Sequence, residues 1–184
     1  MQRFHDSASQ VKSQIWSCVR DVHGRSSQLV MVANLPDTVV GDAFDHLHRE
    51  EGWPLVSLGK AVAAALVEAP APVRPSRIGS AINGAIDRID AAVVLVHHIE
   101  VLFARSLSAH PVRLLAARAR DRVVVSHWPG VFQPATALGG EHRLTYSEPS
   151  HSEWFEHAAA DLAVVYPHPD AWNPRVARTT SPSE

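Results

Sequence analysis

Short apolar runs, separated by longer amphipathic segments, dominate the pattern of hydrophobic positions along the chain. One uninterrupted run of six apolar residues is Ala91 to Val96, which is rich in valine. A strand that is buried on both faces has this pattern, because neither face tolerates a polar side chain. Other short segments predict further strands, at residues 29–33, 54–58, 122–126, 143–147 and 162–166.

Apolar residues at every third or fourth position predict helices between these strands. The predicted helices cover residues 1–23, a segment with Asp42 as N-cap, residues 60–69, and segments that begin at Ser76, near Pro111 and at Ser150. Strands that alternate with helices form a parallel sheet with helices packed against it. The sequence therefore predicts an α/β fold, with a mainly parallel sheet and helices on both faces.

The same pattern divides the chain into three parts. Residues 1–24 form an amino-terminal helix, and we expect its apolar stripe around Ile15 to pack on the chain's own domain. Residues 25–166 form the α/β domain. Residues 167–184 are rich in Pro, Ser, Thr and Arg, which predicts a disordered tail.

Polar residues directly follow the strand predicted at residues 91–96. They are His97, His98 and Glu100, and they come just past the end of the strand, where open α/β sheets bind ligands. Near the start of the chain, a strand, a loop over 34–38 and a helix succeed one another. This succession is the layout of a phosphate-binding unit.

Composition narrows the class of protein. The chain has 184 residues, of which 46% are hydrophobic, and a formal net charge of −2. One globular domain is therefore expected, without a general attraction to nucleic acid or anionic membranes. Its one cysteine, Cys18, excludes an internal disulfide and a cysteine-based zinc site. Because we find neither a signal peptide nor an apolar run of membrane-spanning length, we expect a cytoplasmic protein with no membrane partner.

Three pieces of the sequence carry a resemblance to a known family. They are Ile-Glu-Val-Leu-Phe at 99–103, Trp-Pro-Gly at 128–130 and Leu-Thr-Tyr-Ser-Glu-Pro at 144–149. Together with the segments around them, residues 28–168 resemble BrxF, the small P-loop protein of type 3 BREX phage-defence systems. The resemblance implies a P-loop NTPase-like fold with a RecA/AAA-type core. It also implies a role beside the large ATPase, the DNA methyltransferase and the phosphatase-like protein of such systems.

The residues that bind nucleotide in a P-loop protein are replaced in this chain. A Walker A loop, G-x-x-x-x-G-K-[ST], wraps the phosphates with backbone N–H groups, while its Lys neutralises charge and its hydroxyl binds Mg²⁺. In this register the two glycines are Ala33 and Thr38, the Lys is Val39 and the Ser/Thr is Val40. His97 stands at the Walker B Asp position, although Mg²⁺ prefers oxygen ligands.

We therefore expect a degenerate nucleotide site that has lost ATP hydrolysis. Its residues are Ala33, Asn34, Asp37, Thr38, Val39, Val40, His97, His98, Glu100, Ser126 and His127. No catalytic residue, metal or cofactor is expected, and the chain is interpreted as a non-catalytic scaffold or adaptor of a BREX-type complex. Its expected partner is a large ATPase or a DNA methyltransferase. The alternative is a weak or unconventional NTPase that uses ATP with Mg²⁺, in which Glu100 polarises water.

Metal binding is a second use for the histidines of this edge. His97, His98 and His127, together with a histidine from residues 46–48, would suit Zn²⁺ if the fold gathered them. Their spacing matches no zinc signature. The simpler interpretation is that they are polar residues at the rim of a vacated nucleotide cleft.

Hydrolase chemistry is a third possibility at the same edge. Ser126, His127 and Asp37 supply the side chains of a catalytic triad. The chain has no G-x-S-x-G nucleophile elbow, however, which such a serine hydrolase of this fold class would carry.

A segment rich in arginine offers a contact surface for DNA or for a neighbouring ATP site. Its arginines are Arg105, Arg113, Arg118, Arg120 and Arg122. A solvated helix face is the simpler interpretation. Since Trp and Arg anchor many protein interfaces, the interface candidates are Trp16, Trp128, Arg113 and Arg120.

Overall fold

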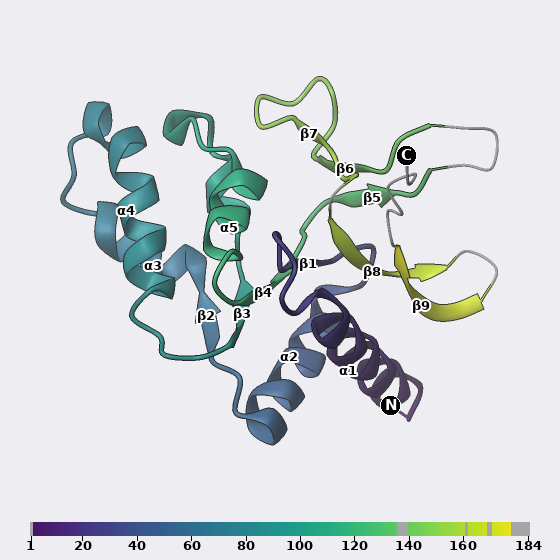
Figure 1. The fold of residues 1–184 in the computed structure, drawn as a ribbon. Coiled ribbons are helices and arrows are strands. Elements are labelled where there is room, and N and C mark those ends of the chain that lie inside the picture. The colour runs from purple at the N-terminus through teal and green to yellow at the C-terminus, as the bar shows by residue number, and fades with distance from the viewer. Residues whose placement is uncertain (1, 136–139, 161, 169–170, 178–184) are drawn as a thin grey trace.

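The computed structural model describes residues 2–135, 140–160, 162–168 and 171–177. Its helices are α1 (Gln2–Val22), α2 (Asp37–Glu51), α3 (Leu58–Leu66), α4 (Arg74–Ile86) and α5 (Pro111–Arg118), with short 3₁₀ helices η1 (Ala71–Val73), η2 (Glu100–Phe103) and η3 (Arg105–Leu107). Its strands are β1 (Leu29–Val32), β2 (Leu55–Ser57), β3 (Val93–His97), β4 (Val123–His127), β5 (Val131–Gln133), β6 (Arg143–Tyr146), β7 (Phe155–Ala158), β8 (Ala163–His168) and β9 (Ala171–Ala177). Figure 1 shows α3, α4 and α5 on one side of the main sheet, and α1 and α2 on the other.

The main sheet has the strand order β2-β3-β4-β1-β8-β9. The first five of these strands run parallel, and β9 pairs antiparallel with β8 at the edge. Because β1 lies between β4 and β8, the loop that follows it opens in the middle of the carboxyl edge. The predicted α/β fold with a mainly parallel sheet is confirmed.

The strands separate two apolar cores, because successive side chains point to opposite faces. On one face, Ile15 of α1 and Phe44 of α2 are buried in the same core as Val125 of β4. On the other face, the core contains residues of α3, α4 and α5, among them Ile82, with Val124 of β4. Helices therefore cover both faces as predicted, and the apolar stripe of α1 is buried against the chain's own domain.

Two helix predictions are wrong in instructive ways. The helix after β1 begins at Asp37, directly after Pro36, and not at Asp42; the fixed φ of proline suits a residue that precedes the first turn. No helix begins at Ser150, because Phe155–Ala158 forms β7, which pairs with β6 in an antiparallel sheet of order β5-β6-β7. Of the strands in this second sheet, β6 lies within the strand predicted at 143–147, whereas β5 and β7 were not predicted.

The carboxy-terminal segment also differs from the prediction over part of its length. Residues 171–177, within the predicted disordered tail, form the edge strand β9. Pro174 lies opposite Pro167 of β8 in this pair. An edge strand tolerates proline, because its outward positions need no N–H donor. Residues 178–184 of the predicted tail lie outside the described part of the chain.

Candidate functional site at the carboxyl edge of the sheet

The ends of three parallel strands bring the predicted site residues to one edge. Val32 of β1 lies opposite His127 of β4, and Ser57 of β2 lies opposite His97 of β3. The helix after β1 packs on one face of the sheet, whereas α5, which follows β3, packs on the other. Such a change of face opens a crevice between strand ends, which is the usual ligand position in open α/β sheets.

A small pocket of about 270 Å³ occupies this crevice. It is lined by Asp37, Val40, Gly41, Phe44, Asp45, Leu55, His97, His98, Glu100 and His127. Six of these belong to the predicted site, whereas Ala33, Asn34, Thr38, Val39 and Ser126 do not line the pocket. Asp45 and Leu55 are additions that the sequence did not single out, because they reach the edge only through the packing of α2 and β2 against it.

Burial shifts two histidines of the pocket, His97 and His127, towards the neutral form. Burial lowers the pKa of His127 below its ordinary value, although the carboxylate of Asp37 lies 3.7 Å from its Nε2 and opposes the shift. Burial, and then the adjacent imidazole of His98, lower the pKa of His97. The rings of His97 and His98 lie 4.0 Å apart, and the Ser57 hydroxyl lies 3.2 Å from Nδ1 of His98. Burial thus disfavours the positive charge on His97 and His127 that would favour polyphosphate at this edge.

The residues expected at the Walker A positions are closed in by packing. Val39 and Val40, at the expected positions of the Lys and the Ser/Thr, are 2% and 1% exposed and belong to the core beneath α1 and α2. Asn34, with a φ of 58°, donates to the carbonyl of Phe132 and accepts from its N–H, so its side chain fastens the loop to β5. The N–H of Ala33 bonds to Val165 of β8. Pro36 has no N–H to offer a phosphate.

The other chemistries proposed for these residues lack the required geometry. Ser126 is fully buried on the opposite face of β4 from His127, and its hydroxyl donates to the His127 carbonyl, so the two side chains form no catalytic pair. Ser126 therefore leaves the predicted nucleotide site as well. Within the described residues, no group of three or more His, Cys, Asp or Glu side chains is placed to hold a metal ion.

The three sequence pieces that carry the family resemblance meet in one aromatic cluster. Phe103 stacks on Tyr146 at 3.9 Å and contacts Trp128 edge-on at 5.2 Å. The indole N–H of Trp128 donates to the carbonyl of Thr145, and a Cβ at Gly130 would overlap that carbonyl oxygen. The cluster joins the two sheets, so these pieces have a structural role. Trp128 is 1% exposed, which overturns its prediction as an interface anchor.

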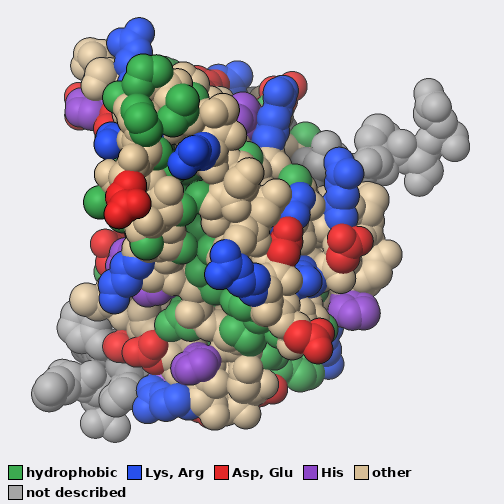
Figure 2. All heavy atoms as spheres, turned by 90° about the vertical axis from the view of Figure 1, so that its left-hand side faces the viewer, with side chains coloured by type: hydrophobic (Ala, Val, Ile, Leu, Met, Phe, Trp, Pro, Cys, Tyr) green, Lys and Arg blue, Asp and Glu red, His purple; other side chains and the backbone are tan. Residues whose placement is uncertain are grey.

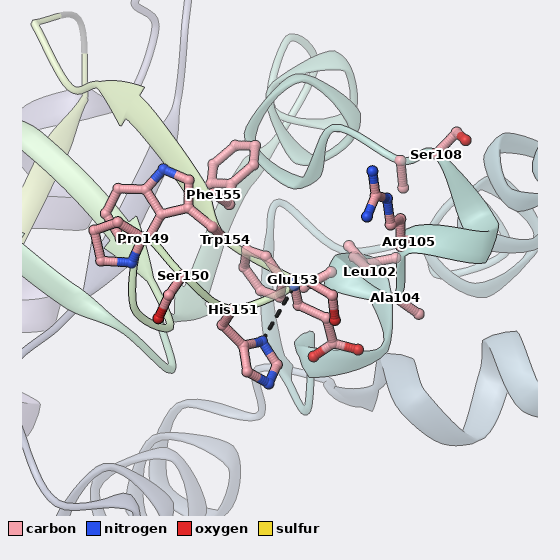
Figure 3. Close-up of a pocket in the computed structure, with 13 residues that line it drawn as sticks. Leu102, Ala104, Arg105, Ser108, Pro149, Ser150, His151, Glu153, Trp154 and Phe155 are labelled. Atoms are coloured by element: carbon pink, nitrogen blue, oxygen red, sulfur yellow. Dashed lines mark hydrogen bonds between the residues drawn. The ribbon is translucent and has the colours of Figure 1, made fainter.

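A wider pocket of about 660 Å³ lies beside the aromatic cluster (Figure 3). Residues 102–109 form one wall, and residues 149–155 form the other. In Figure 3, Arg105 and Ser108 lie across the pocket from Trp154 and Phe155, and the N–H of Glu153 donates to Nδ1 of His151. This pocket was not predicted, because a helix was expected to begin at Ser150, where the chain instead forms turns that lead into β7.

The arginine-rich segment is partly structural. Arg118 pairs with Asp87 at 2.7 Å, and Arg122 donates to the carbonyls of Ile86 and Ile89. These two arginines therefore tie α5 and β4 to the end of α4. Arg113 and Arg120 are exposed and stay interface candidates, as does Trp16, which is partly buried beneath the guanidinium of Arg20.

In comparisons with known proteins, no family model, no curated protein and no solved structure matches this chain. In the part of the chain that the structure describes, no helix combines the length and the apolar character needed to cross a bilayer. These comparisons therefore assign neither a family nor a function to the chain.

Proposed function

We propose that this chain is a P-loop-type protein that has lost ATP hydrolysis and serves as a scaffold or adaptor subunit. The observation that carries the proposal is the burial of Val39 and Val40 at the Walker A positions for Lys and Ser/Thr. A valine can neither neutralise a phosphate nor bind Mg²⁺, and these two valines are committed to the core. Loss of single electrostatic contacts of this kind already costs several kcal/mol in catalysis.

The fold supports this proposal by its strand order. Five parallel strands with β1 near the middle are compatible with the RecA/AAA-type core that the resemblance to BrxF implies. His97, whose pKa is lowered by burial, stands where that core would carry an Mg²⁺-binding aspartate. The pocket of about 270 Å³ at this edge is also small for a nucleoside triphosphate, since ligand pockets commonly span about 300 to 1,000 Å³.

The proposed setting is a BREX-type anti-phage complex, in which the chain docks a large ATPase or a DNA methyltransferase. This setting rests on the resemblance to BrxF over residues 28–168. The arrangement suits a docking role, because the sheet is packed on both faces and leaves a pocket of only about 270 Å³ at the usual nucleotide position.

Calorimetric titration with Mg-ATP, up to millimolar nucleotide, tests the loss of nucleotide binding. We expect no heat of binding and no ATP turnover. Saturable binding, together with turnover that Glu100→Gln lowers, would establish the NTPase alternative instead. Co-purification of the full chain with a co-expressed BREX-type ATPase or methyltransferase tests the setting, and elution of the chain alone in gel filtration would contradict it.

A further inference from the structure

An open surface feature separate from the carboxyl-edge pocket lies between α3 and α4. A groove of about 700 Å³ runs between these helices. Its lining consists of Ala61, Ala64, Ala65, Arg77, Ser80, Ala81, Gly84, Ala85 and Arg88. In Figure 2, which faces the side of the molecule where α3 and α4 lie, hydrophobic side chains are seen among Lys and Arg side chains.

The floor of the groove is made of very small residues. Ala64 and Ala65 of α3 are exposed, and Gly84 of α4 presents only its backbone. Beneath this floor the core is already complete, since Val62 and Ile82 are buried on the inner sides of the same helices. Small side chains on two adjacent helices leave a seat in which a third helix can approach closely, as ridges of one helix fill the grooves of another.

The charges of the groove have one sign. Arg77 and Arg88 are its only ionic lining residues, and no described acidic side chain pairs with either of them. The guanidinium of Arg88 folds back over Gly84. Gly84 lies seven residues from Arg77, or about 10 Å along a helix, so the two cations are about two turns apart. The neighbouring Asp87 is paired with Arg118 instead. A ligand of this groove therefore meets an apolar floor between two unpaired cations.

The geometry points to a docking site for an amphipathic helix of a partner protein, with small apolar residues on one face and carboxylates about two turns apart. Such a helix would lay its apolar face on the alanines and place its carboxylates against Arg77 and Arg88. Helix-in-groove recognition uses this arrangement of apolar anchors, and Arg binds carboxylates in a bidentate manner. DNA fits less well, because an apolar floor with two cations offers few phosphate contacts.

This inference deepens the proposed scaffold function, on which it rests, by naming the surface and the chemistry of the partner. The two proposals fail in different experiments. Binding of Mg-ATP would overturn the loss of nucleotide binding and leave the groove untouched. Failure of the groove to bind an acidic helix would overturn the docking site and leave the nucleotide result unchanged.

The test uses the full chain and two designed helical peptides of about 18 residues, which carry an Ala/Leu face and either glutamates or lysines seven residues apart. Fluorescence anisotropy measures their binding. We expect saturable binding of the glutamate peptide, which the double substitution Arg77→Glu/Arg88→Glu weakens by roughly tenfold or more. The lysine peptide should bind the doubly substituted chain better than it binds the unchanged one.

A matched pair of glycine substitutions tests the apolar floor. Gly84→Leu fills the groove, and its Cβ meets only the flexible end of Arg88. Gly79→Leu, on the same helix but outside the lining, has open space around its Cβ. We expect Gly84→Leu to weaken binding of the glutamate peptide by tenfold or more, on the order of 1.4 kcal/mol, and Gly79→Leu to leave it unchanged. Circular dichroism verifies that each variant is folded.

Three results would overturn the docking site. One is the absence of saturable binding of the glutamate peptide. Another is binding that neither Gly84→Leu nor the double charge reversal weakens. The third is a self-associated chain in analytical ultracentrifugation that the double charge reversal converts to a monomer, because the groove would then be covered by a second copy.

Discussion

The carboxyl edge of the sheet and the α3–α4 groove differ in how their space is used. At the carboxyl edge, where this class of fold binds ligands, Val39, Val40 and Phe44 fill the core and leave about 270 Å³. Between α3 and α4, alanines and a glycine leave a groove of about 700 Å³ on the outside. Under the proposed function, loss of the nucleotide site has not loosened the fold, because apolar side chains fill its positions.

The largest effect on this comparison is expected from a lysine at position 39, the position that a Walker A lysine would occupy. Val39→Lys places an ammonium group in a position that is 2% exposed, and burial of a charge without a partner is strongly unfavourable. We expect the free energy of unfolding to fall by about 3 kcal/mol or more, measured by urea denaturation, with no gain in affinity for Mg-ATP.

Thr38→Lys is the matched control for that substitution. Thr38 is the neighbouring residue in the first turn of α2 and is exposed. The same added charge should therefore change stability by no more than about 0.5 kcal/mol. If Val39→Lys were equally mild and the variant bound Mg-ATP, the edge would be an open nucleotide site and not a sealed one.

A second prediction concerns pH, to which the two regions should respond differently. Burial lowers the pKa of His127 and of His97 in the folded chain. Below the ordinary histidine pKa of about 6.5, the unfolded chain therefore binds more protons than the folded one. Their contribution to stability is present above about pH 6.5 and is lost as the pH falls towards their folded pKa values.

His127→Gln should therefore make the free energy of unfolding less dependent on pH between about 7 and 5. The loss of slope should be partial, since burial also lowers the pKa of His97, His110 and His157. Urea denaturation at several pH values measures the slope. An unchanged slope would show that His127 is as accessible to protons in the folded chain as in the unfolded one. The groove, whose ionic residues are arginines, should contribute nothing in this range.

The smallest expected effect is on the groove side. Gly84→Ala and Gly79→Ala each replace a glycine inside α4, which should raise the free energy of unfolding by about 0.5 to 1 kcal/mol. Thermal or urea unfolding measures both. The alanine Cβ meets only the end of Arg88 at position 84 and nothing at position 79. A clear loss of stability at Gly84 alone would show that the groove is packed and not open.

Hydrophobic pattern determined much of the fold without help from the structure. The runs around β1, β3, β4 and β8 are mostly buried in the structure, and their β-branched residues favour strands. The helices that alternate with these strands cover both faces of the sheet. The motif comparison likewise marked Val39 and Val40 from residue types alone. The sequence also indicated that His97 and His127 would share an edge, because carboxyl ends of parallel strands lie together.

Tertiary packing decided what local pattern could not. Phe155 suits a helix as well as a strand, and only the pairing of β7 with β6 and the edge-on contact of its ring with Phe103 select the strand. Trp128 in a Trp-Pro-Gly turn is equally compatible with an exposed anchor, and its burial depends on Phe103 and Thr145, which are distant in the sequence. Ser126 does not belong to the predicted site, because side chains alternate along β4 and the Ser126 side chain points to the opposite face from His127. The α3–α4 groove could not be predicted from the sequence either, since the small residues of α3 and α4 form one surface only when the fold places the two helices side by side.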